Sequence, residues 1–344
     1  MFEMTPSELE NRVKIGIALV MAILVAIPFV TDSSGVIRMV TFAFIWAGFA
    51  VSWNMFSGFS GYISFGHAIF FGTGAFTSMY LVNHFDISPW IGMIAGAVMA
   101  GLMGVLIGFI TLRSLSGIYF ALSILAITLI AEPLVTWLGF IEVSLPFDPQ
   151  REFYYMSFRG LTPYYFISLG LLIFAFLVSW KVKTSKMGYY LNAIKGSEPA
   201  ARSLGVNAYR TEIYALAISG FLSGLFGTVF MQANFIFTAE SAFGVHTLVQ
   251  PVVLTIAGGM GTLFGPIVGA FLLFPFAEML RAEFGGVVPG IHNVIYGVVL
   301  IIIIIYLPDG ILPGVQNFVE RRFVRTENAT EDADTVDSEG QTND

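Results

Sequence analysis

Two carboxylates stand within long apolar stretches of this chain. Glu132 is followed by Pro133, and Glu278 is followed three residues later by Arg281. A carboxylate among apolar residues is costly and usually faces protein or water, so Glu132 is a candidate to line or gate a pathway. The alternatives for Glu132 are an interhelical hydrogen bond or a place near the outer surface, and Glu278 can simply pair with Arg281.

The residue types of the sequence do not support metal binding or covalent catalysis. The sequence has no cysteine, and its four histidines do not show the spacing of metal ligands. It contains no His-Glu-x-x-His, no Gly-x-Ser-x-Gly and no Gly-x-x-x-x-Gly-Lys-Ser/Thr phosphate loop. We therefore expect no catalytic residue, no metal site and no cofactor bound by this chain, and any ATP must be hydrolysed by another protein.

The elements that hold these residues are predicted to be membrane helices. The chain has 344 residues, of which 56% are hydrophobic and 11% charged, whereas soluble domains carry about 25% charged residues. Several stretches approach the roughly 20 apolar residues that a bilayer-spanning helix needs. We predict an all-α integral membrane protein of about ten transmembrane helices. Their predicted ranges are 15–30, 37–56, 65–83, 90–112, 118–139, 164–180, 212–231, 248–260, 265–280 and 287–307.

The distribution of charge predicts the orientation, because cytoplasmic loops keep Lys and Arg. With ten spans, twelve of the sixteen basic residues fall on the side of both termini, which is therefore predicted to be cytoplasmic. The divisions are a cytoplasmic segment 1–14, a transmembrane domain 15–308 with an inner loop 181–210, and a tail 309–344. Residues 326–344 hold seven acids and no base, so we expect a disordered cytoplasmic tail.

The inner loop 181–210 is long for a connector in a compact bundle. Ser197 can cap a short helix, Glu198 suits its first turn, Pro199 is tolerated there, and Gly205 can end it. From the residues alone, this helix either docks into a groove of a cytoplasmic partner or lies on lipid headgroups.

Two glycine-dense segments occupy comparable places in the two halves of the chain, at 57–74 and 258–269. The eighth predicted span is short and ends in the second segment, so we expect a broken or re-entrant helix there. Interrupted apolar segments in both halves favour an internal repeat around a central pathway. For single glycines the alternative is close helix packing, and for His67 it is a structural hydrogen bond. The pathway or substrate candidates are Asn54, Gly58, Gly61, Ser64, Gly66, His67, Glu132, Gly258, Gly259 and Gly261.

Three motifs in this order resemble the branched-chain amino acid ABC transporter permease family. Residues 53–68 resemble its Asn-x-x-x-Gly-x-x-Gly-x-x-Ser-x-Gly-His-Ala stretch, and residues 257–270 resemble its Gly-Gly-x-Gly-Ser-x-x-Gly-Pro stretch. The inner loop resembles its coupling loop to the ATPase. It departs at Lys195, where the family's basic residue is usually Arg, and at Gly196 and Pro199, where an acidic and an aliphatic residue are more common. The matching positions are Gly188, Ala193, Ile194, Lys195, Glu198, Ala200, Ala201, Leu204 and Gly205.

The resemblance implies a multi-subunit importer in the plasma membrane. Its expected partners are a second, related permease subunit, two cytoplasmic ABC ATPases that use ATP and Mg, an external substrate-binding protein and the lipid bilayer, with no nucleic acid. The implied cargo is branched-chain amino acids, although urea and amide importers use similar permeases. The alternative is a secondary transporter driven by an ion gradient, for which only Glu132 and Glu278 are available as intramembrane charges.

Overall fold

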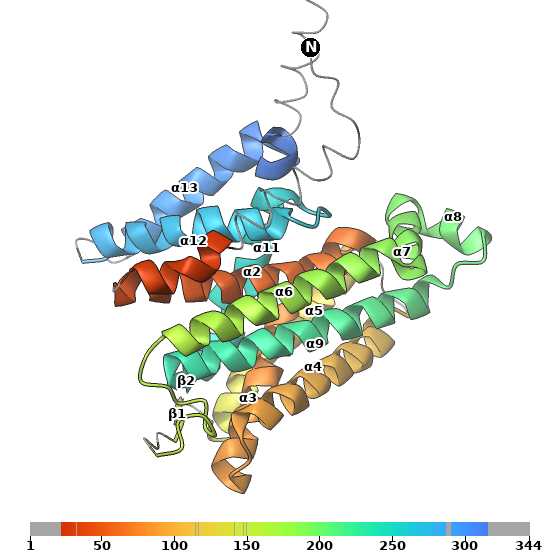
Figure 1. Ribbon diagram of the computed structural model, residues 1–344. Helices are drawn as coiled ribbons and strands as arrows, with labels where there is room; N and C mark the ends of the chain where they lie inside the picture. Colours follow the sequence, from red (N-terminus) through yellow and green to blue (C-terminus); the bar gives the residue numbers. More distant parts are fainter. Residues whose placement is uncertain are drawn as a thin grey trace, which may run out of the picture.

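The computed structural model describes residues 22–315 except 32, 114, 116, 141, 147, 149 and 287–289. Residues 22–30 are helical and precede a series of long helices (Figure 1). These are α2 (Ser34–Ser60), α3 (His67–Phe85), α4 (Pro89–Thr111), α5 (Ile118–Trp137), α6 (Thr162–Thr184), α7 (Lys186–Gly196), α8 (Glu198–Ser203), α9 (Ala208–Asn234), α10 (Ala239–Phe243), α11 (Val245–Gly259), α12 (Gly265–Phe284) and α13 (Ile291–Tyr306). Two three-residue strands, β1 (Glu142–Ser144) and β2 (Ile236–Thr238), pair antiparallel.

Six helical segments of the described part are long and apolar enough to cross a membrane: α2, α4, α5, α6, α9 and the stretch Ala239–Gly259. The prediction of an all-α membrane protein is confirmed, but the count of about ten spans is not. α13 has 16 residues, about 24 Å of helix, which is shorter than the roughly 30 Å hydrocarbon core. The first predicted span lies partly outside the described residues.

Helix α9 is the centre of the bundle and packs against α2, α3 and α4. The most apolar stretch of α9 is 72% buried, whereas that of α5 is only 22% buried. Ile118, Tyr119 and Ile130 of α5 are each more than 60% exposed. An apolar helix surface of this kind is stable only against lipid or another subunit.

Glycines allow α3, α4 and α9 to cross at very short range. A Cβ at Gly96 would clash with the carbonyl of Gly74, and one at Gly224 would lie 3.0 Å from the Cα of Ala97. Small residues at helix crossings are the usual solution in membrane proteins, because van der Waals packing replaces the hydrophobic effect there.

The two ends of the molecule differ. Helices α7 and α8 lie at one end, and the paired strands β1 and β2 lie at the other (Figure 1). The strands were not predicted, because three residues are too few for an alternating pattern.

The sequence predicts an interruption of the second half at the Gly258 segment, whereas the structure breaks the helix earlier, at Gly244, between α10 and α11. The Gly258 segment itself forms the end of α11 and the turn into α12. Residues 1–21 and 316–344 lie outside the described residues, and with them the predicted cytoplasmic segment and most of the acidic tail. Residues 311–315, which the sequence assigned to that tail, are helical.

The predicted inner-loop helix is present as α8. The side chain of Ser197 accepts a hydrogen bond from the backbone N–H of Ala200, Pro199 lies in the first turn, and Gly205 adopts a φ of +87° just beyond the end. The second helix of the loop, α7, was not predicted. With α7 present, the loop 181–210 is almost wholly helical.

Candidate functional site

Asn54 joins the two glycine segments. It lies in the last third of α2 and is 1% exposed. Its side-chain N–H₂ donates to the carbonyl of Thr262 at 2.7 Å, and its side-chain oxygen accepts from the N–H of Gly261 at 2.8 Å. One amide thereby satisfies a backbone acceptor and a backbone donor in the turn that follows α11. Such paired bonds fix the turn against α2.

Two lysines of the inner loop region hold the same turn and the end of α2. Lys195 of α7 donates through Nζ to the carbonyl of Gly58 at 3.0 Å, and Lys183 of α6 donates to the carbonyl of Gly261 at 3.0 Å. Lys183 also lies 5.5 Å from the ring centre of Phe59. We call these groups, Asn54, Gly58, Gly261, Lys183 and Lys195, the glycine junction.

Glycines in the junction and next to it are needed for close approach and for backbone conformation. A Cβ at Gly58 would lie 2.9 Å from the nitrogen of Gly261. Gly259 and Gly261 have φ values of +130° and +81°, which L side chains rarely adopt. A Cβ at Gly310 would lie 2.5 Å from Gly259, so the segment after α13 also packs on this turn.

The loop from Gly61 to Gly66 links α2 to α3 and is fixed from within. The indole N–H of Trp53 donates to the carbonyl of Ser64 at 2.6 Å, and the N–H of Ser64 donates to the hydroxyl of Ser57 at 3.2 Å. Gly61 caps α2 with a φ of +80°. A Cβ at Gly66 would lie within 2.9 Å of the carbonyl of Ile124, which places α5 against this loop.

His67 is a buried structural bridge. Its Nδ1 lies 2.8 Å from the hydroxyl of Ser64, and its Nε2 lies 2.6 Å from the hydroxyl of Ser219 on α9. Ser219 already donates its hydrogen to the carbonyl of Ser52 at 2.6 Å, so Nε2 donates to Ser219. In the neutral imidazole, Nδ1 then accepts from the hydroxyl of Ser64. Both ring nitrogens are thus used within the protein.

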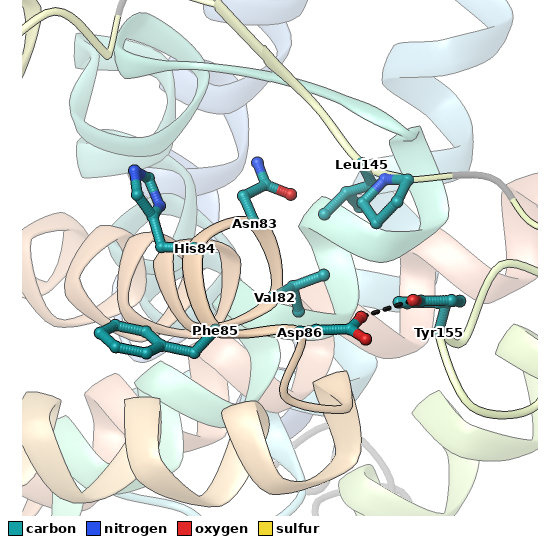
Figure 2. A pocket seen from close by; sticks show the side chains of 8 residues that line it. Val82, Asn83, His84, Phe85, Asp86, Leu145 and Tyr155 are labelled. Atoms are coloured by element: carbon teal, nitrogen blue, oxygen red, sulfur yellow. Dashed lines mark hydrogen bonds between the residues drawn. The ribbon is translucent and has the colours of Figure 1, made fainter.

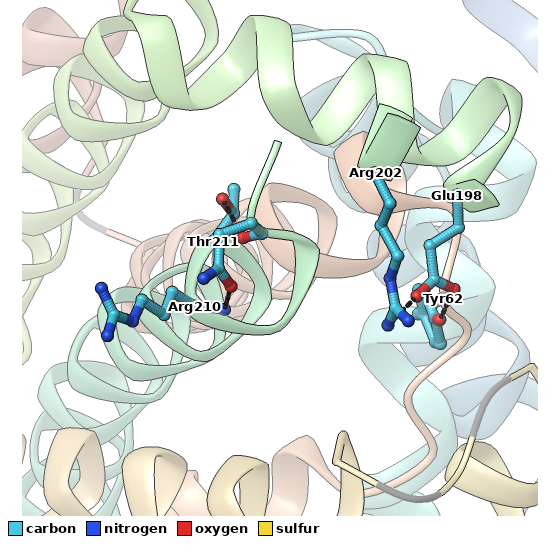
Figure 3. Close-up of polar contacts among 6 residues, drawn as sticks. Tyr62, Glu198, Arg202, Arg210 and Thr211 are labelled. Atoms are coloured by element: carbon cyan, nitrogen blue, oxygen red, sulfur yellow. Dashed lines mark hydrogen bonds and ion pairs between the residues drawn. The ribbon is translucent and has the colours of Figure 1, made fainter. Parts of the chain in front are cut away.

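The second contact of the inner loop is made by Tyr62. Its hydroxyl donates to Glu198 of α8 at 2.7 Å, and Glu198 also pairs with Arg202 at 2.5 Å (Figure 3). Burial, together with the bond to Glu198, raises the pKa of Tyr62. Beneath these polar contacts, Ile194 and Ala201 form a small buried cluster with Tyr62. Helices α7 and α8 are thus attached to the loop that begins α3.

The remaining predicted loop residues divide into buried and exposed positions. Gly188 is buried where α7 meets the end of α6, and a Cβ there would clash with backbone carbonyls. Ala193, Ala200 and Gly205 are exposed, and Leu204 is 85% exposed. The apolar side chains of α8 and its C-cap therefore face different ways: Ala201 packs inward, and Ala200 and Leu204 are exposed.

Glu132 does not belong to the junction. It is half-buried on α5, one turn beyond Thr128, whose hydroxyl approaches the carbonyl of Gly66 at 3.3 Å. Its role in a pathway stays a prediction. Gly258 packs where α11 meets α12, since a Cβ there would lie 2.8 Å from the nitrogen of Gly269.

Sequence reasoning missed several residues of this region. Lys183, Thr262 and Tyr62 act through contacts with segments that are distant in sequence. Thr262 and Tyr62 lie within the two matched motifs, but nothing in those motifs indicates their partners. Glu212, near the start of α9, is 1% exposed, and one of its oxygens has no hydrogen-bond partner among the described residues. An acidic residue at the start of a predicted apolar span was the available signal. Within the described residues, no group of three metal-ligating side chains could hold a metal ion.

At the end of the molecule opposite α7 and α8, a cavity of about 780 Å³ lies between the end of α3 and the segment before α6. Asp86 accepts a hydrogen bond from the hydroxyl of Tyr155 at 2.5 Å (Figure 2). The hydroxyl of Tyr154 donates to the Asp86 carbonyl at 2.7 Å. These bonds fix the long segment between α5 and α6 against α3.

These features define the class of protein: a multi-pass helical membrane protein whose inner loop is attached to two glycine-rich turns. The family described as the permease component of branched-chain amino acid transport systems matches residues 35–304, most of the chain. The chain belongs to this family of transport subunits.

Individual relatives share modest sequence identity with this chain. The chain is 25% identical to the high-affinity branched-chain amino acid transport system permease protein LivM of Escherichia coli, over 87% of this chain and 75% of that protein. It is 24% identical to a probable branched-chain amino acid permease, LivH, of Methanocaldococcus jannaschii, over 67% and 75%. A shorter match, 27% identical over 31% of this chain and 36% of that protein, is to the ribose import permease RbsC of Haemophilus influenzae.

Proposed function

We propose that this chain is the permease subunit of an ATP-binding-cassette importer in the plasma membrane, with both termini in the cytoplasm. It translocates branched-chain amino acids, or related small amino acids and amides such as urea. A second, related permease subunit completes the pathway, and an external binding protein delivers the substrate. Two cytoplasmic ATPases, which bind ATP and Mg, supply the energy. The names of the LivM and LivH relatives support the cargo.

The observation that carries this proposal is the attachment of the inner loop to the glycine junction. Lys195 and Glu198 connect α7 and α8 to Gly58 and Tyr62, on either side of the end of α2. A force applied to α8 therefore reaches the α2–α3 loop without an intervening flexible segment. Leu204 is 85% exposed at the tip of this unit, as expected of an apolar anchor that a partner covers.

The first experiment is gentle purification of the tagged protein from its native membrane, followed by mass spectrometry of the proteins that accompany it. We expect a stoichiometric phosphate-loop ATPase and a second permease. A homo-oligomer without an ATPase in several mild detergents would contradict the proposal and favour an ion-coupled carrier.

The second experiment tests the loop in the assembled transporter. Glu198→Arg, or deletion of Ser197–Gly205, should abolish uptake of radiolabelled L-leucine while the protein still inserts into the membrane. The matched control is Glu152→Arg, which breaks the 2.9 Å ion pair with Arg159 in the outer segment. Normal uptake by a correctly inserted deletion variant would exclude coupling through α8.

A further inference from the structure

The end of the molecule opposite α7 and α8 contains a second, larger cavity. Its volume is about 960 Å³, near the upper end of the 300–1,000 Å³ of small-molecule sites. It is lined by residues from α2, α9, α10, α11 and α12 together with β2. A cavity formed by elements from both halves of the chain suits a ligand that enters between them.

One wall of this cavity is aromatic. Phe42 and Trp46, one turn apart on α2, are 7% and 3% exposed and meet Phe230 of α9. The ring centres of Phe42 and Trp46 lie 5.7 Å and 5.4 Å from that of Phe230. Rings held in this way provide a rigid apolar surface that fits an aliphatic side chain of a ligand.

The rim of the same cavity carries charge of both signs. Glu278 and Arg281 of α12 approach each other at 3.4 Å. Arg38 lies 5.3 Å from the ring centre of Phe42. Neither Arg38 nor Glu240 forms an ion pair within the described part of the chain, and both line the cavity.

The four charged residues of the rim sum to no net charge. A ligand with one positive and one negative group would give both Arg38 and Glu240 a counter-charge. An anion or a cation would leave one of these two residues without a counter-charge. A sugar or urea would use neither Arg38 nor Glu240 as an ionic partner. The combination of a free base, a free acid and an aromatic wall is therefore most complementary to a zwitterion with an apolar side chain.

The position of the cavity fits the entry side of an import pathway. Arg38 and Asn54 are sixteen residues apart on α2, about 24 Å along the helix axis. The cavity is thus separated from the glycine junction by most of the membrane thickness, on the side away from the coupling helices.

We propose that this cavity is an outer binding site for the zwitterion of an aliphatic amino acid. Arg38 binds the α-carboxylate, Glu240 binds the α-ammonium group, and Phe42, Trp46 and Phe230 contact the side chain. The inference rests on the proposed function and assigns its substrate class to specific residues of this chain.

The experiment is photo-crosslinking of the full chain in its co-purified complex with L-photo-leucine, followed by peptide mapping. We expect labelled peptides from α2 and α12 at the cavity, with labelling suppressed by excess L-leucine. Two leucine analogues test the ionic contacts: 4-methylpentanoate lacks the ammonium group, and 3-methylbutylamine lacks the carboxylate. Neither should compete as L-leucine does.

Variants then test the assigned residues. Arg38→Gln and Glu240→Gln should each reduce cavity labelling about tenfold, the loss expected for one charged hydrogen-bonding partner. Arg159→Gln, in the outer segment and away from the cavity, is the matched control and should label normally. All three positions are surface-exposed, so correct folding is expected and is checked by size-exclusion chromatography.

Unlabelled cavity peptides, equal competition by either analogue or by ribose, or normal labelling of both variants would overturn the assignment. If L-leucine uptake persists while the cavity is not labelled, the site is wrong and the proposed function stands. If no ATPase co-purifies but the chain alone is labelled at the cavity, the importer proposal fails and the site stands.

Discussion

The buried polar residues near the end of α2 and the start of α3 hold the backbone in place. Asn54 and His67 are each 1% exposed, and every polar atom of their side chains meets a partner. This accounts for their position beside glycines: a turn with positive φ exposes backbone groups that need fixed partners. Pathway contact by either residue remains a prediction.

His67→Ala should lower the stability of the protein. It removes the hydrogen bonds to the hydroxyls of Ser64 and Ser219 and leaves the buried Ser64 hydroxyl without its acceptor, at a cost of about 1–3 kcal/mol. The control is His84→Ala, on the exposed end of α3, which should have little effect. Thermal unfolding of the purified proteins in one detergent measures the difference, and equal stability would show that the bridge is not structural.

Asn54→Asp tests the junction with nearly the same side-chain shape. The variant keeps the acceptor for the N–H of Gly261 but turns a carboxylate oxygen toward the Thr262 carbonyl. We therefore expect the protein to be less stable, by about 1–3 kcal/mol, and its uptake to be slower. Asn192→Asp, exposed on α7, is the control. Unchanged uptake by Asn54→Asp would remove the junction from the transport cycle.

At the scale of elements, glycine contacts determine how closely α3, α4 and α9 pack. Gly96→Ala places a methyl group against the carbonyl of Gly74, whereas a Cβ at Gly170 on α6 meets nothing within 4 Å. We expect Gly96→Ala to be destabilising, and Gly170→Ala to be neutral or stabilising by about 0.5–1 kcal/mol, since alanine favours helix. Urea or thermal unfolding of both variants compares them, and similar stabilities would contradict this packing.

The coupling of α8 to the α2–α3 loop can be tested by removing one oxygen. Tyr62→Phe deletes the hydroxyl that donates to Glu198, so we expect uptake to fall while ATPase binding persists. Because its raised pKa keeps Tyr62 protonated, the ratio of variant to wild-type uptake should be the same at about pH 6 and about pH 8. Tyr189→Phe, exposed on α7, is the control. Wild-type uptake by Tyr62→Phe would exclude this contact from coupling.

At the scale of the whole molecule, the orientation in the membrane can be measured directly because the chain has no cysteine. With α7 in the cytoplasm, Asn192→Cys should react with a membrane-impermeant maleimide only after the cells are permeabilised. Arg151→Cys, in the segment before α6, should react in intact cells. The opposite pattern would invert the proposed topology.

The sequence alone determined the features that depend on local interactions. Apolar stretches of about 20 residues are typical of membrane helices whatever their neighbours. Ser197, Pro199 and Gly205 indicated α8 because capping involves residues only a few positions apart. The motifs at 53–68 and 257–270 identified the family for the same reason, since each is a continuous stretch.

Only the tertiary structure decided which distant residues meet. Gly261 and Asn54 are 207 positions apart, and Tyr62 and Glu198 are 136 apart. Their pairing follows from how α2 packs against α11, α12 and α7, which no local pattern encodes. The same holds for the cavity between Arg38 and Glu240, because its walls come from helices of both halves of the chain. Local propensity forms the helices, but packing at their crossings brings the functional groups together.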